Sequence, residues 1–237
     1  MSKYAILADS EPVICQKLVS LGYKLIYTVS VDEFISYEKK HVDMQCLKID
    51  DNYFVLNTCN KLYDTLHNLG LNVIKTTDNV SGKYPQNIKL NALVMNKTIV
   101  GKVDSLDSKL IKYFKDNNFK MINVNQGYTA CSCVKVSDNA IITSDKSIIR
   151  ALKNTDINTL EISDGKISLL GAKRGETGFI GGASTMLDKN NLLFFGNIKE
   201  HPDYNKIKDF CYSRGVLINY IEEIALSDIG GAVLLNF

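Results

Sequence analysis

The residues best suited to chemistry at neutral pH are one histidine and two cysteines, in two short segments of alternating character. His41, Asp43 and Gln45 alternate with apolar residues, and Cys131 and Cys133 flank a serine. In a strand every second side chain shares a face, so the first three would point one way. An imidazole beside a carboxylate can move a proton, and a thiol near such an imidazole is a nucleophile with its base.

The strand interpretation leaves the relation between the two segments open. In one predicted strand a single face would carry Thr129, Cys131 and Cys133. In another predicted strand a single face would carry Asn87, Lys89 and Asn91. When the predicted hairpins are aligned at their turns, four residues fall in one column: Cys46, Asn91, Cys133 and Ser184. His41 and Asp43 then lie on the opposite parity to Cys131, unless a bulge shifts the register. The alternative is that both cysteines are small core residues.

Glycines and carboxylates complete the candidate set. Gly181 and Gly182 carry no side chains. They either leave room for a channel in which backbone N–H groups face a ligand, or allow the strands to pack tightly. Asp228 precedes residues 229–232, which repeat the Ile-Gly-Gly-Ala of residues 180–183, and it is a ligand candidate. Asp145 is either a ligand or a helix cap. The predicted catalytic residues are His41, Asp43, Cys131 and Cys133, and the predicted ligand-binding residues are Gln45, Lys89, Asn91, Thr129, Asp145, Gly181, Gly182, Ser184 and Asp228.

The elements that must position these residues form a fivefold repeat. Five segments read as an amphipathic helix, a break and a short apolar strand, with breaks at Gly22, Gly70, Asn118, Asp156 and Gly215. Glycine or asparagine suits the left-handed residue after a helix. Hairpins lie between these segments, with turns at Asp51-Asn52, Asn96-Lys97, Asp138-Asn139 and around Lys189-Asn190. The repeat predicts a closed ring rather than several domains.

The fifth hairpin is divided between the two ends of the chain. Residues 229–232 repeat the Ile-Gly-Gly-Ala of 180–183, and 5–10 resemble 140–145. A strand taken from the N-terminus would close the ring and remove an exposed sheet edge. The single domain 1–237 then has units near 30–80, 81–125, 126–162 and 178–221, with 227–237 completed by 1–29. The Asp164-Gly165 pair predicts an inserted hairpin at 162–177.

Composition excludes several other classes. Net charge is +2 without a block of basic residues, which argues against a nucleic-acid partner. No apolar run reaches the roughly 18 residues that a membrane span needs, and the N-terminus does not read as a signal peptide. The six cysteines lack disulfide or zinc spacing, which favours free thiols in the cytoplasm. The glycine runs match no nucleotide-binding motif, so no cofactor or metal is expected.

Six stretches resemble a known superfamily and together span nearly the whole chain: HVDMQ, QGYTACS, NAIITSDK, GFIGGAS, KEHPDY and SDIGGA. They resemble an uncharacterised clostridial branch of the pentein superfamily, the fold of the guanidine-modifying enzymes. The resemblance implies an α/β propeller of five ββαβ units with pseudo-fivefold symmetry. In catalytic members a cysteine of the last unit attacks a guanidinium carbon, a histidine moves protons and carboxylates hold the nitrogens. Here Gly230-Gly231-Ala232-Val233 occupies that region and contains no thiol.

Two functions follow as hypotheses. The first is a small polar or cationic ligand in the axial channel, with hydrolysis at a guanidine- or amidine-like carbon. Cys131 or Cys133 would attack, His41 would transfer protons and Asp43 would hold the cation. The second is a non-catalytic pentein that binds a macromolecular partner. An open channel lined by His41 and a cysteine favours the first, and a closed channel beside a wide apolar patch favours the second. The sequence leaves the ligand and the oligomeric state open.

Overall fold

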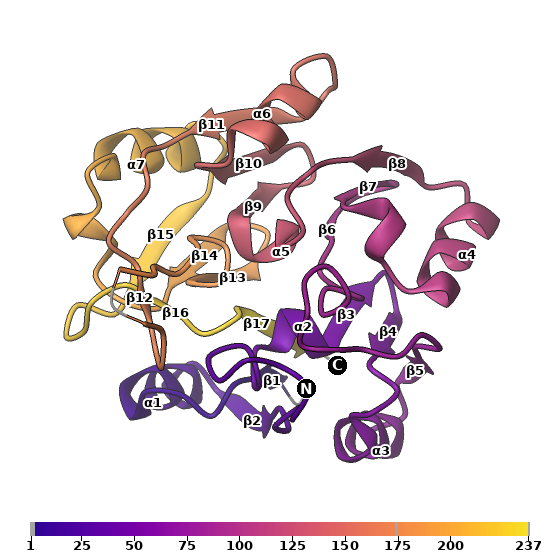
Figure 1. Cartoon of the computed structure of the whole chain (residues 1–237). Coiled ribbons are helices and arrows are strands. Elements are labelled where there is room, and N and C mark those ends of the chain that lie inside the picture. Colours follow the sequence, from indigo (N-terminus) through magenta and orange to yellow (C-terminus); the bar gives the residue numbers. More distant parts are fainter. Residues whose placement is uncertain (1–2, 174, 237) are drawn as a thin grey trace.

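The computed structural model describes residues 3–173 and 175–236, which form five three-stranded sheets arranged in a ring (Figure 1). In each sheet the middle strand pairs antiparallel with one neighbour and parallel with the other, and a helix connects the parallel pair. The first four sheets are β3 (Cys46–Ile49), β4 (Asn52–Val55) and β5 (Asn72–Lys75); β6 (Leu93–Met95), β7 (Thr98–Gly101) and β8 (Lys120–Asn123); β9 (Cys133–Ser137), β10 (Ala140–Thr143) and β11 (Asn158–Glu161); and β13 (Ser184–Asp188), β14 (Asn191–Phe194) and β15 (Leu217–Tyr220).

The fifth sheet joins the two ends of the chain. β17 (Ala232–Asn236) pairs antiparallel with β1 (Lys3–Leu7), so that Leu7 lies opposite Ala232. β1 also pairs in parallel with β2 (Tyr23–Tyr27). The predicted closure by a borrowed N-terminal strand is therefore confirmed, and β1 occupies the middle of its sheet instead of an exposed edge.

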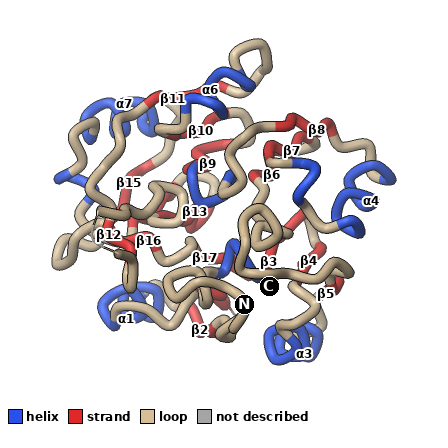
Figure 2. Tube along the Cα trace, viewed as in Figure 1, coloured by secondary structure: helices blue, strands red, loops and turns tan. Residues whose placement is uncertain are grey.

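Five helices lie at the rim of the ring, outside the strands (Figure 2). They are α1 (Pro12–Ser20), α3 (Asn60–Asn68), α4 (Ser108–Asp116), α6 (Lys146–Leu152) and α7 (Tyr204–Tyr212). Each buries two side chains four residues apart, which is the spacing that places side chains on one helix face. The pairs are Ile14 and Leu18, Leu62 and Leu66, Leu110 and Phe114, Ile148 and Leu152, and Ile207 and Cys211. Cys211 is thus a core residue of the fourth unit.

Positive φ angles follow four of the five helices, as the breaks predicted. Gly22, Gly70, Asn118 and Gly215 have φ angles of 88°, 80°, 56° and 70°. Three of the four predicted hairpin turns lie where expected, between β6 and β7, β9 and β10, and β13 and β14. The first turn is at Asp50-Asp51, one residue earlier than predicted, and Asp50 takes the positive φ of 52°.

The prediction that residues 41–45 and 129–133 form strands is wrong. Val42–Gln45 forms the short helix α2, and Thr129–Ser132 forms the equivalent short helix α5. Residues 87–91 form turns before β6 and no strand. His41, Asp43 and Gln45 therefore do not share a face, and neither do Thr129, Cys131 and Cys133. Over five residues an alternating pattern fits a helical turn as well as a strand, so periodicity could not decide between them.

The predicted inserted hairpin is also wrong. In this segment only β12 (Ser168–Leu169) is a strand, and it pairs in parallel with β16 (Ser227–Asp228) rather than with its own neighbour. Gly165 serves close packing, because a Cβ there would lie 2.6 Å from the His201 ring. The pairing places the segment directly beside Asp228, since Leu169 lies opposite it.

Candidate functional site

A pocket of about 270 Å³ lies where α2, α5 and the segment around β12 and β16 meet. Because α2 and α5 lead directly into the inner strands β3 and β9, we call it the axial pocket. Its lining combines an imidazole, a thiol, three carboxylates and several aromatic rings. The lining residues are Tyr37, Glu38, His41, Met44, Tyr128, Cys131, Leu169, Glu176, Thr177, Phe179 and Asp228. Neither lysine nor arginine lines the pocket among the residues that the structure describes.

Close backbone packing holds the imidazole and the thiol in place. His41 immediately precedes α2, and a Cβ at Gly230 would lie 2.6 Å from its Cα. The N–H of Gly182 donates to the carbonyl of Cys131 at 2.9 Å, and a Cβ at Gly181 would overlap that same region of α5. The glycines therefore allow the last two units to approach the axis, and the Gly182 N–H is already used within the fold.

The thiol of Cys131 contacts two polar side chains. It donates to Oδ2 of Asp43, with 2.6 Å between sulfur and oxygen, and it accepts from Nδ2 of Asn91 at 3.1 Å. Asn91 is itself fixed, since its Oδ1 accepts from the N–H of Ala130 at 2.8 Å. Burial and then the charge of Asp43 raise the pKa of the Cys131 thiol well above its usual value. In the free protein this sulfur is therefore a thiol, not a thiolate.

Two carboxyl groups near the thiol, those of Asp43 and Asp228, have pKa values above their usual range. Burial, followed by the nearby charge of Asp228, raises the pKa of Asp43 well above its usual range. Burial also raises the pKa of Asp228, although His41 partly opposes this. Asp228 accepts from the N–H groups of Phe179 at 2.8 Å and Gly230 at 2.9 Å. Two carboxyl groups are thus held close together away from water, an arrangement that a bound cation would stabilise.

His41 lies beside Asp228, with 4.0 Å between Nδ1 and the nearer carboxylate oxygen. Burial lowers the pKa of His41, and the charges of Asp228 and Glu38 oppose that effect. The imidazole is consequently neutral near neutral pH and able to accept a proton.

Glu38 is the most important lining residue that the sequence did not reveal. The residue is only 6% exposed, and Oε2 accepts from Nδ2 of Asn87 at 2.9 Å. The Tyr128 hydroxyl also hydrogen-bonds to Glu38 and accepts from the same Asn87 amide at 2.8 Å. Tyr128 stacks on Tyr84 and on Phe179, which extends an aromatic row along the pocket wall. Glu38 belongs to an irregular segment, where no periodicity could single it out.

Four predicted residues line a second, larger cavity of about 640 Å³ instead of the axial pocket. Residues of all five inner strands, β3, β6, β9, β13 and β17, line this cavity, which we call the rear cavity. Asp43, Cys133, Gly181 and Ser184 contribute to it. Cys133 and Ser184 each begin an inner strand, so they occupy equivalent positions, as the column alignment predicted. Burial raises the pKa of Cys133 to about 12. The structure thus brings Cys131, not Cys133, to the pocket that contains His41.

Several predicted ligand residues support the fold instead of lining the axial pocket. Gln45 bonds the backbone of Val29 and Lys39, which fixes the segment before His41. Thr129 is fully buried and donates to the carbonyl of Gln126 at 2.7 Å. Asp145 caps α6 through the N–H groups of Ser147 and Ile148, the alternative that its position before a helix also allowed.

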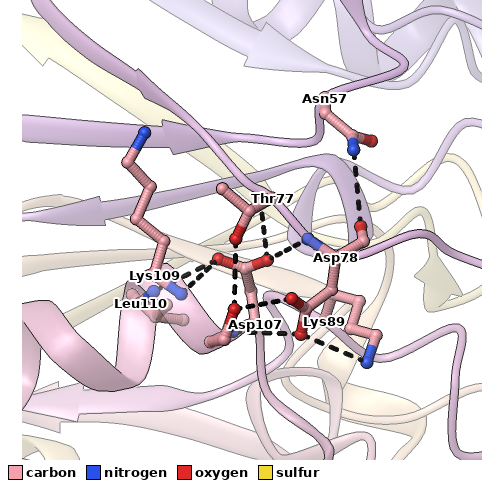
Figure 3. Close-up of polar contacts among 8 residues, drawn as sticks. Asn57, Thr77, Asp78, Lys89, Asp107, Lys109 and Leu110 are labelled. Carbon is pink, nitrogen blue, oxygen red and sulfur yellow. Dashed lines mark hydrogen bonds and ion pairs between the residues drawn. The ribbon is translucent and has the colours of Figure 1, made fainter.

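Lys89 lies in a polar clasp between the first two units (Figure 3). Its ammonium group is 3.7 Å from Asp78, whose carboxylate accepts from the N–H and hydroxyl of Ser108. Asp107 completes the clasp: one oxygen caps α4, and the other accepts from the N–H groups of Thr77 and Asp78. Lys89 is therefore engaged in joining units and does not line the axial pocket.

Two negative findings apply to residues 3–173 and 175–236. No group of three or more histidine, cysteine or acidic side chains there could hold a metal ion. In the same ranges no helix has the length and apolar character to cross a bilayer.

The ring of five ββαβ units around this site defines a pentein-fold protein, and solved structures agree. DDAH from Pseudomonas aeruginosa, a mutant complexed with citrulline, matches with a TM-score of 0.59 and 10% identity over 100% of both chains. Agmatine deiminase from C. jejuni matches at 0.54 and 10%, over 93% of this chain and 88% of its own. Inosamine-phosphate amidinotransferase from Streptomyces griseus matches at 0.56 and 11%, over 93% and 76%.

The chain belongs to a family described as a family of unknown function, DUF6873, whose model matches residues 6–233. A search of curated proteins finds no match.

Proposed function

We propose that the protein binds a small cation bearing a guanidinium or amidinium group in the axial pocket and hydrolyses it at the central carbon. One observation carries the proposal. Three carboxyl groups, those of the buried Glu38 and Asp228 and of the partly buried Asp43, surround Cys131 and His41, and over the described residues none has a lysine or arginine partner. Uncompensated buried carboxylates are costly, so a planar cation that hydrogen-bonds to them is the ligand they favour.

The lining assigns a role to each group. Glu38 and Asp228 line the pocket and would hold the nitrogens of the cation, a role that the sequence had given to Asp43. Cys131 Sγ would add to the central carbon as its proton passes to a neighbouring base. The leaving nitrogen then takes a proton from a water molecule, and the C–N bond breaks to release ammonia or an amine. The hydroxide left behind adds to the cationic central carbon. His41 accepts the hydroxyl proton as the C–S bond breaks to release a urea or amide, and then passes that proton to solvent.

The test separates binding from turnover. Isothermal titration should show that benzamidine binds more tightly than benzamide, which has nearly the same shape and no charge. Ammonia release should be measured over a panel of small guanidines and amidines. The variant C131S should retain benzamidine binding and lose turnover, whereas C15S, which alters a half-buried thiol on α1, should retain both. Equal affinity for benzamide and benzamidine would refute the cationic ligand.

A non-catalytic protein that binds a macromolecular partner is the second candidate, and two observations favour it. The Cys131 thiol is kept protonated by burial and by Asp43. Exposed apolar side chains, Ile35, Tyr84 and Leu170, also lie on segments that contribute to the axial pocket or contact its wall. This candidate predicts no ammonia release from any member of the panel.

A further inference from the structure

The hydrogen bonds of Cys131 identify the base that would receive its proton. Among the described residues, the sulfur has one hydrogen-bond acceptor, Oδ2 of Asp43 at 2.6 Å, and one donor, Nδ2 of Asn91 at 3.1 Å. A thiol placed between an acceptor and a donor can lose its proton to the first while the second stabilises the resulting thiolate.

Asp43 lies between the two cavities. It belongs to α2 and contributes to the wall of the rear cavity, whereas Cys131 contributes to the wall of the axial pocket. Its second oxygen, Oδ1, is buried and has no hydrogen-bond partner among residues 3–173 and 175–236. No described side chain therefore neutralises Asp43 in the way that a capping or ion-pairing role would require, and one of its oxygens points at the sulfur.

We propose that Asp43 is a catalytic base that takes the proton of Cys131 during attack, on the side of the sulfur away from the ligand. This inference rests on the proposed function. The Sγ–H bond breaks and the proton moves to Oδ2. The S–C bond forms, and the electron pair of the C=N⁺ bond moves onto nitrogen to give a neutral tetrahedral adduct. Asp43 returns its proton to Sγ when the C–S bond breaks, while His41 serves the attacking water.

The groups facing Asp43 come from several elements. Cys131 faces it from α5, Asp228 from β16, Glu38 from the segment that leads into α2, and the Asn91 amide from the turn before β6. Burial, followed by the charges of Asp228 and Glu38, raises the pKa of Asp43 and makes it more basic than an exposed aspartate, and a cation bound to Glu38 and Asp228 would favour the thiolate. The arrangement thus matches a base to a thiol that is poorly acidic when no ligand is bound.

The pH dependence of Cys131 alkylation tests this role without requiring turnover or cation binding. Iodoacetamide is uncharged, and its product at Cys131 can be followed by mass spectrometry of the peptide. The rate should be measured from about pH 5 to about pH 9 in the wild type, D43N and D116N. D116N removes an exposed carboxylate on α4 and is the control.

With Asp43 as the base, the wild-type rate should be nearly independent of pH between the titrations of Asp43 and the thiol. In D43N the rate should instead rise about tenfold per pH unit below the thiol pKa, because only the thiolate reacts. D116N should follow the wild type. Parallel profiles in the wild type and D43N, or no labelling of Cys131 in either, would overturn the proposal. The wild-type profile decides alone if D43N does not fold.

The outcome is separable from the proposed function. A plateau in the wild type together with no benzamidine binding would refute the cationic ligand and leave Asp43 as the base for the thiol. Tight benzamidine binding with parallel profiles would do the reverse.

Discussion

Replacing Glu38 by glutamine should weaken binding of an amidinium ligand without destabilising the fold. In the wild type Oε2 of Glu38 accepts from Nδ2 of Asn87 at 2.9 Å. Glutamine keeps the size of the side chain and an oxygen that can accept the same hydrogen bond. It removes the charge of a residue that is buried and lines the axial pocket. A hydrogen bond to a charged group contributes about 1.5–3 kcal/mol, which corresponds to a roughly ten- to hundredfold increase in Kd.

The assay is isothermal titration of benzamidine into the wild type, E38Q and E222Q. Glu222 is exposed and pairs with Lys199 at 3.4 Å, so E222Q removes a surface carboxylate as the matched control. The melting temperature of E38Q should equal or exceed that of the wild type, because one member of a repelling carboxyl cluster loses its charge. A Kd for E38Q within about twofold of the wild type would refute the assignment of the cation to this pocket.

Three further predictions concern the clasp, proton release and acid stability. D107A leaves four backbone N–H groups without their carboxylate and should reduce the free energy of unfolding in urea by about 2–5 kcal/mol, whereas D116A should change it little. Benzamidine binding should release protons because a cation lowers the raised pKa values of Asp43 and Asp228; a binding enthalpy independent of buffer ionisation would contradict this. Because burial lowers the pKa of His41, its contribution to stability is present above the unfolded-state pKa of 6.5 and is lost as pH falls through the folded-state pKa. Between about pH 7 and about pH 5, the melting temperature of H41N should therefore fall less than that of the wild type.

The fold could be predicted because each unit carries its own complete pattern. The buried pairs four residues apart, the positive-φ residues Gly22, Gly70, Asn118 and Gly215, and the Asn or Asp turns are all local signals. Closure was readable from two repeated motifs, since β1 resembles β10 and the residues before β17 repeat those before β13. When the local signals of each unit agree with the overall repeat, a repeat fold can be predicted from a single sequence.

The site was predicted only in part because its geometry depends on non-repeating pieces. His41, Asp43, Cys131 and Asp228 were singled out by residue type, and the structure brings all four into one cluster at the axial pocket. Their relative orientation was missed because a five-residue pattern does not separate a helical turn from a strand. Glu38 and Glu176 lie in irregular segments, and the approach of Glu38 to Asn87 joins residues 49 positions apart. No local pattern encodes such a contact.

A crystal structure of the protein with bound benzamidine tests the central claim most directly. The amidinium should lie in the axial pocket, with its nitrogens hydrogen-bonded to Glu38 and Asp228 and its central carbon about 3–3.5 Å from Sγ of Cys131. Benzamidine in the rear cavity, or an axial pocket that remains empty at saturating ligand, would contradict the assignment of this pocket as the cation site.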